Sequence, residues 1–262
     1  MIVARVADVA VAEERFEVRT IGVNDVRDAL RQGWADFLDK RGDLVFVGII
    51  YPVIGMAAAI AAFGGSLFPF LFPVAAGLGL LGPVAASGFY ELARRREEGL
   101  EAGWTHFLDV ARRPAFESLA AVASLLLVIF ASWIATAAFL YLALFGDAAT
   151  SAGAFLGRLF TTSEGWALIV LGNLAGFVFS VLALMVSVVS MPMLVDKDVD
   201  ARTALRTSMR AVMANKAVML RWGVTVAALL VIGSVPFFVG LAVVLPVLGY
   251  ATWHLYTRIV VR

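Results

Sequence analysis

The chain has 262 residues, of which 61% are hydrophobic and only 16% are charged. Soluble domains have about 25% charged residues, so this composition excludes an ordinary soluble fold and indicates a membrane protein. The net charge of +1 gives no reason to expect a nucleic-acid partner. The absence of cysteine excludes disulfides, iron–sulfur clusters and cysteine nucleophiles.

A heptapeptide pattern, Gly-Trp-x-x-Phe-Leu-Asp, occurs at residues 33–39 and again at residues 103–109. A degenerate third copy begins at Leu205. Each copy lies in a polar, amphipathic segment that is followed by two long apolar runs. This recurrence predicts an all-α membrane protein built from three repeats, each a cytoplasmic amphipathic helix followed by a transmembrane hairpin.

The six apolar runs are read as spans because about 20 apolar residues cross a bilayer core, and the one sizeable loop on the side opposite the amphipathic segments is expected at 146–165. The chain is expected to start with an N-terminal cytoplasmic arm over 1–23, followed by repeat 1 over 24–90, which has an amphipathic helix at 24–40 and spans at 44–63 and 67–90. Repeat 2 covers 91–191, with an amphipathic helix at 97–111 and spans at 118–145 and 166–191. Repeat 3 covers 196–257, with an amphipathic helix at 200–215 and spans at 217–232 and 237–256. Asn24 is the expected N-cap of the first amphipathic helix. The proline- and glycine-rich second span is expected to be kinked.

The positive charges are distributed unevenly about these spans. With the spans drawn in this way, 20 of the 21 Lys and Arg residues lie on one side, and only Arg158 lies on the other. Because positively charged loops stay in the cytoplasm, both termini and all three amphipathic segments are expected to be cytoplasmic. The arm lacks the apolar core of a cleavable signal peptide. We therefore expect a multi-pass protein of a bacterial inner membrane.

The spans contain few groups that carry chemistry. As drawn, they have no Asp, Glu or Lys in their interiors, and Arg221 and His254 lie near their cytoplasmic ends. Because ionisable groups inside a bilayer usually mark proton or substrate paths, a proton-coupled transporter is not expected. The common enzyme motifs are also missing, so no catalytic residue is assigned and enzymatic activity is not expected.

The two histidines, His106 and His254, are predicted to lie on the same side of the membrane. Two axial histidines can hold one haem, but nothing else in the sequence frames such a site. The alternative is an interfacial His106 and a helix-end His254 that the C-terminal dipole stabilises. We favour this alternative and expect no metal or cofactor.

The most polar position within a span is Asn173, which lies in a Gly-x-x-x-Gly pattern formed by Gly172 and Gly176. This pattern is typical of close helix packing, in which the amide bonds to a neighbouring helix. The other role open to Asn173 is contact with a substrate or an ion. We favour helix packing.

The repeated motif is the best candidate for an interaction surface. Its glycine allows close backbone approach, and its Trp and Phe supply apolar anchors. The candidate residues are Gly33, Trp34, Phe37, Gly103, Trp104 and Phe107. The alternative, which repeat architectures favour, is that each copy simply docks on its own hairpin.

A Leu-x-x-Gly-Trp-x-x-Phe helix ahead of proline- and glycine-rich spans, in a six-span layout, resembles a family of predicted bacterial integral membrane proteins of unknown function. The resemblance covers about residues 23–256 and brings no established activity or catalytic residue. Some relatives are loosely described as respiratory-oxidase-like. This sequence departs from that description, because two histidines do not supply the haem and copper ligands of an oxidase.

These observations favour a non-enzymatic accessory, assembly or scaffold subunit of an inner-membrane complex. Its expected partners are membrane lipid and other integral membrane proteins or a second copy of the chain. A transporter or channel for a neutral or lipidic substrate is the alternative. A membrane enzyme that acts on lipid is the third hypothesis.

Overall fold

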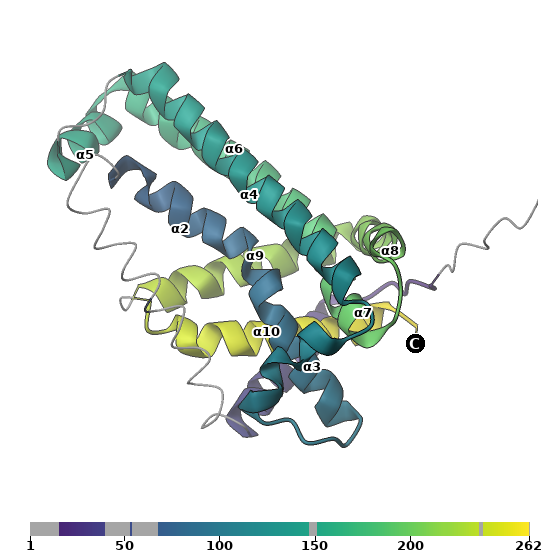
Figure 1. Cartoon of the computed structure of the whole chain (residues 1–262). Coiled ribbons are helices and arrows are strands. Elements are labelled where there is room, and N and C mark those ends of the chain that lie inside the picture. The colour runs from purple at the N-terminus through teal and green to yellow at the C-terminus, as the bar shows by residue number, and fades with distance from the viewer. Residues whose placement is uncertain (1–15, 40–52, 54–67, 147–150, 236–237, 262) are drawn as a thin grey trace, which may run out of the picture.

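The computed structural model describes residues 16–39, 53, 68–146, 151–235 and 238–261. In these residues every named element is helical, and the one β-contact is an isolated antiparallel bridge between Val18 and Val260. In chain order the elements are a helix over residues 23–39, η1 (Phe68–Phe70), α2 (Leu71–Leu80), α3 (Gly82–Glu97), η2 (Trp104–Arg112), α4 (Phe116–Phe145), α5 (Ala152–Thr161), α6 (Ser163–Ser187), α7 (Ser190–Asp196), α8 (Ala201–Ala214), α9 (Lys216–Ser234) and α10 (Leu241–Ile259) (Figure 1). The all-α fold class is therefore confirmed for this part of the chain.

Four helical stretches in the described ranges are long and apolar enough to cross a membrane. They are Leu71–Glu97, Phe116–Phe145, Ser163–Asp196 and Lys216–Ser234. These stretches overlap the second to the fifth predicted spans. The first predicted span, at 44–63, lies outside the described residues apart from Val53.

The sixth predicted span corresponds to α10, a helix of 19 residues that is not among those four. Its first half is aliphatic around Pro246, whereas its second half carries His254 and Arg258 and buries Trp253 and Tyr256. These polar and amphipathic groups lower the mean hydropathy of α10. The described helices therefore account for four of the six expected spans.

The proline- and glycine-rich span is interrupted, as the sequence predicts. Helix α2 ends at Leu80, and α3 begins at Gly82 with Pro83 in its first turn. Proline lacks an N–H and fits best in the first turn of a helix, which is where Pro83 lies in α3. A neighbouring helix supports the broken segment, because the indole Nε1 of Trp133 in α4 donates to the carbonyl of Pro73 at 2.7 Å.

The core lies at one end of the helical assembly, where the helix over residues 23–39 meets α3, α7, α8 and α10. Trp222, Trp253 and Tyr256 are among its fully buried side chains. Helices α4 and α6 lie side by side and project from this end, with α5 at their far tips (Figure 1). Their outer faces carry exposed apolar side chains such as Phe139, which suits contact with lipid.

The first amphipathic helix begins at residue 23, one residue before the predicted start. Its first turn is capped by Asp25, whose Oδ2 accepts the backbone N–H of Gly22 at 2.7 Å. Asn24 therefore lies inside the helix, and its expected role as the N-cap is wrong. Asp25, the third helical residue, thus supplies the reciprocal half of a capping box by accepting the N–H of the residue before the helix.

The second amphipathic segment departs from the α-helix expected at 97–111. Helix α3 continues to Glu97, and the motif forms the 3₁₀-helix η2 instead. Gly99, at φ 69°, ends α3, with its N–H bonded to the carbonyl of Arg96 at 3.1 Å and the N–H of Leu100 bonded to that of Arg95 at 2.8 Å. This Schellman arrangement favours glycine, so the start of the expected segment belongs to the preceding helix.

Candidate interaction site

The glycine of the first motif lies against the backbone of α10. A Cβ added at Gly33 would lie 2.6 Å from the backbone N of Ala251 and 2.7 Å from the carbonyl oxygen of Val247. Only glycine allows this approach, because real Cβ atoms do not come within 3.0 Å of such atoms. Gly103, at the matching position, is different: the nearest atom to its added Cβ is Oγ1 of Thr105 at 3.9 Å.

The phenylalanine of each motif points inward. Phe37 is only 5% exposed and belongs to the main core. Phe107 makes an edge-on contact with Phe89 of α3, with ring centroids 5.0 Å apart, and its ring lies where a Cβ at Gly88 would stand. Both copies of the motif are therefore held on the assembly by their phenylalanines.

The tryptophan and leucine of each motif point outward. Trp34 is 48% exposed and Leu38 is 42% exposed, and we call this pair the Trp34 surface. Trp104 is 54% exposed and Leu108 is 73% exposed, and we call this pair the Trp104 surface. The same sequence pattern thus yields the same inward phenylalanine and outward Trp–Leu pair, although one copy is α-helical and the other is 3₁₀-helical.

Ion pairs hold the first motif in place. The ring Nε2 of His254 in α10 donates to Oδ2 of Asp36 at 2.6 Å. Arg96 of α3 lies 3.5 Å from Asp36 and 2.7 Å from Asp39. The two aspartates of the motif therefore tie the helix over residues 23–39 to α3 and α10, and this tie fixes the direction in which the Trp34 surface faces.

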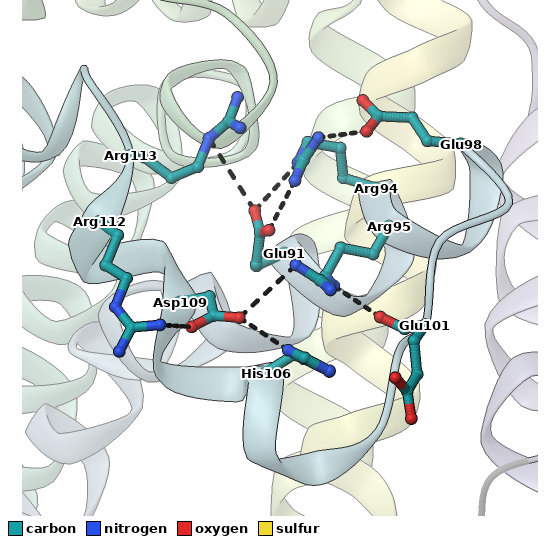
Figure 2. A network of polar contacts seen from close by, with 9 residues as sticks. All are labelled: Glu91, Arg94, Arg95, Glu98, Glu101, His106, Asp109, Arg112 and Arg113. Atoms are coloured by element: carbon teal, nitrogen blue, oxygen red, sulfur yellow. Dashed lines mark hydrogen bonds and ion pairs between the residues drawn. The ribbon is translucent and has the colours of Figure 1, made fainter.

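A buried ion pair supports α3 beneath the second motif. Glu91, whose side chain is 1% exposed, accepts from Nη2 of Arg94 at 2.6 Å and from Nε of Arg94 at 3.0 Å. Figure 2 shows Glu98 on the other side of Arg94 and the guanidinium of Arg113 above Glu91. The buried Nε of Arg113 makes no hydrogen bond and lies 4.0 Å from Glu91. Glu91 therefore faces two neighbouring guanidinium groups, and Glu98 also pairs with that of Arg94.

The aspartate of the second motif joins η2 to α3. Asp109 lies 2.8 Å from Nδ1 of His106, 2.9 Å from Nη1 of Arg112 and 3.5 Å from Nη1 of Arg95 (Figure 2). The hydrogen bond with His106, followed by the charge of Arg112, lowers the pKa of the Asp109 carboxyl below its ordinary value. The Nε of Arg95 also donates to the carbonyl of Glu101 at 2.6 Å, which fixes the connection between α3 and η2.

The lowered pKa of Asp109 predicts that η2 keeps its contacts with α3 in mild acid. A folded-state pKa below the unfolded value stabilises the fold fully above the ordinary carboxyl pKa of about 4, and that stabilisation is lost as the pH falls through the lowered value. Amides in residues 104–112 should keep their hydrogen-exchange protection, corrected for intrinsic rates, from pH 7 to 5 and lose it below about 4. The Asp109→Asn variant should show no such fall. An identical profile in the variant would assign the transition to another group.

The two histidines lie in separate sets of contacts. His106 pairs with Asp109, and His254 pairs with Asp36 through Nε2, which leaves that nitrogen unavailable to an iron atom in this arrangement. In the described ranges, no group of three or more His, Cys, Asp or Glu side chains is placed to hold a metal ion. Both histidines therefore act here as partners of aspartates in the polar network.

Helix α6 places its polar and small residues in different surroundings. Asn173 donates from Nδ2 to the carbonyl of Ile169 at 2.7 Å, so this bond lies within its own helix. A Cβ at Gly176 would lie 3.3 Å from the ring of Trp133, whereas Gly172 faces open space. Close packing is thus visible at Gly176 but not at Gly172, and the hydrogen bond of Asn173 lies within α6 instead of reaching the neighbouring helix that we expected. Contact of Asn173 with a substrate stays the alternative.

The sequence analysis missed the residues that form the ion pairs around Glu91. Glu91 and Arg94 fall just after the second predicted span at 67–90, and the sequence alone assigns them no role in packing. A helical spacing of three between Glu91 and Arg94, directly after the aromatic pair at 89–90, was the available signal. Burial itself was not readable, because it depends on α7 and α10 packing against α3.

Residues 71–196 match the family model DUF2189, described as a predicted integral membrane protein. No curated protein and no solved structure matches the chain. The matched region runs from the start of α2 to the end of α7 and includes three of the four span-like helices, the buried Glu91–Arg94 pair and the Trp104 surface. The match agrees with the resemblance inferred from the motif and the spans: residues 71–196 are similar to a family of predicted integral membrane proteins.

Proposed function

We propose that this protein is a non-enzymatic accessory, assembly or scaffold subunit that binds other integral membrane proteins. The observation that carries the proposal is the common arrangement of the two motifs, each with an inward phenylalanine and an outward Trp–Leu pair. Exposed tryptophan beside exposed leucine is unfavourable in water and is typical of binding surfaces. A sequence selected only for docking on its own hairpin would bury the tryptophan as well.

The tie between the first motif and the core supports a binding role. Asp36 and Asp39 are used to fix the helix over residues 23–39 to His254 and Arg96, so the Trp34 surface is presented rigidly. A rigid surface loses less entropy on binding than a mobile one. Asn173 bonds within its own helix, so this residue gives no support to the transporter alternative.

The proposed setting is a bacterial inner membrane crossed six times, in three repeats of an amphipathic helix and a hairpin. Both motif surfaces, the core and the termini then lie on the cytoplasmic side. The support is the distribution of Lys and Arg, of which Arg158 in α5 is the exception, at the far tips of α4 and α6 (Figure 1).

The test is a double variant, Trp34→Ala with Trp104→Ala, in which a discrete membrane complex is measured. The wild-type protein, solubilised gently, should migrate with a partner of fixed stoichiometry. The double variant should lose at least about tenfold of that complex, since two exposed aromatic anchors each contribute about 1 kcal/mol or more. Its thermal unfolding should change little, because both side chains are exposed.

Trp166→Ala is the matched control, since Trp166 is similarly exposed but lies near the start of α6, at the end away from the core and the two motifs. This variant should retain the complex. A partner-free, monodisperse wild-type protein would contradict the scaffold role. The double variant could also keep the complex and lose only its tight association with the membrane. That result would make the two surfaces lipid anchors and would likewise contradict the scaffold role.

A further inference from the structure

A cavity lies between the first amphipathic helix and α9. It has a volume of about 150 Å³. Its lining is Val23, Val26, Arg27, Leu30, Arg221 and Thr225. Two guanidinium groups thus border one small space whose remaining walls are mostly aliphatic.

The two arginines of the cavity are not used by the fold. Arg27 and Arg221 are both exposed, and within the described residues neither makes a hydrogen bond or an ion pair through its side chain. The nearby carboxylate of Asp28 is already engaged by Arg31 at 2.9 Å. Five N–H donors on each guanidinium are therefore open to an anion, and phosphate oxygens match their geometry.

The position of the cavity on α9 indicates where such an anion comes from. Arg221 is the sixth residue of α9, a helix long and apolar enough to cross a membrane, so the cavity lies about two turns from its charged end. Beyond Arg221 the same face of α9 carries exposed Val224 and Val231, and exposed Val235 directly follows the helix. An apolar stripe thus leads from the two arginines along the span.

We propose that this cavity binds the headgroup of an anionic phospholipid, with its phosphate between Arg27 and Arg221 and an acyl chain along the exposed valines of α9. The aliphatic wall formed by Val23, Val26 and Leu30 holds the glycerol region. A free phosphate would use the arginines but gain nothing from the stripe. The lipid would also join the amphipathic helix to α9, in addition to the contacts that the fold already makes.

The experiment compares lipids on the purified full chain by native mass spectrometry after exchange from a neutral detergent. Dioleoylphosphatidylglycerol should remain bound, and dioleoylphosphatidylcholine should not. Each of Arg27→Gln and Arg221→Gln should weaken binding of the anionic lipid roughly fivefold, and the double variant roughly thirtyfold, because a basic residue at a membrane surface contributes about 1 kcal/mol. Lys216→Gln removes one charge at the start of the same helix, outside the cavity, and should change binding less than twofold.

Two further arms separate the possible outcomes. Millimolar inorganic phosphate should fail to displace the bound lipid, and displacement would overturn a lipid in favour of a free anion. The double Gln variant should unfold at the wild-type temperature, since both arginines are exposed. Equal lipid binding by wild type and double variant, or an equal loss in Lys216→Gln, would overturn the site.

Discussion

Gly33→Ala should detach the helix over residues 23–39 from α10, whereas Gly103→Ala should leave the fold intact. The added methyl group at Gly33 would stand 2.6 Å from the backbone N of Ala251, and a backbone atom inside a packed helix does not move aside easily. Overpacking of this kind costs about 1–3 kcal/mol. At Gly103 the backbone is extended, at φ −82° and ψ 167°, and the space is open, so alanine fits.

The two glycine variants also differ in the effect of helix propensity, which makes the comparison more informative. Gly33 lies in a helix, where alanine is intrinsically better than glycine by about 1 kcal/mol. A net loss of stability in Gly33→Ala therefore shows that the contact with α10 outweighs helix propensity. The measurements are unfolding in detergent and hydrogen exchange over residues 23–39. Unchanged protection there in Gly33→Ala would show that the helix is not packed as tightly as its distances imply.

Glu91→Ala should be among the most destabilising single substitutions in the described part of the chain. It removes a carboxylate that is 1% exposed and leaves the guanidinium of Arg94, at 9% exposure, without its main partner. Breaking a buried pair by removing one member costs about 3–5 kcal/mol. Arg113, whose buried Nε has only Glu91 nearby, would lose that carboxylate as well.

Glu101→Ala is the control for Glu91→Ala, because Glu101 is exposed and uses only its backbone carbonyl in the network. We expect a change within about 0.5 kcal/mol for this variant in equilibrium unfolding in detergent. A double variant, Glu91→Leu with Arg94→Leu, should regain much of the loss, since apolar pairs often replace buried ion pairs at little cost. A Glu91→Ala protein as stable as Glu101→Ala would place Glu91 in a solvated position.

The helices that sequence reasoning located well are those with strong local signals. Asp200 was read as the start of a helix, and it caps α8 by accepting the N–H of Thr203 at 2.8 Å. The long apolar runs of α4 and α6 are likewise recognisable from a single stretch of sequence, because the bilayer sets their length. These elements need no information from distant residues.

The candidate site needed information that no single segment contains. The direction of Trp34 depends on contacts with His254 and Arg96, which lie far away in sequence. The second motif has the same residues at the same spacing as the first, yet it forms a 3₁₀-helix that follows the end of α3 at Gly99. The motif therefore predicts which side chain is buried and which is exposed better than it predicts the type of helix.

The hydrogen bond between Asp36 and His254 has a consequence for how the protein is made. Its partners are 218 residues apart, so the first amphipathic helix leaves the ribosome long before α10 exists. At common rates of synthesis this delay is roughly 10 to 40 seconds. During that time the face around Gly33 has no backbone to pack on, and every intervening span enters the membrane first. The core is complete only when the helix over residues 23–39 packs on α10, so a nascent chain that stops before α10 exposes this face to chaperones and proteases.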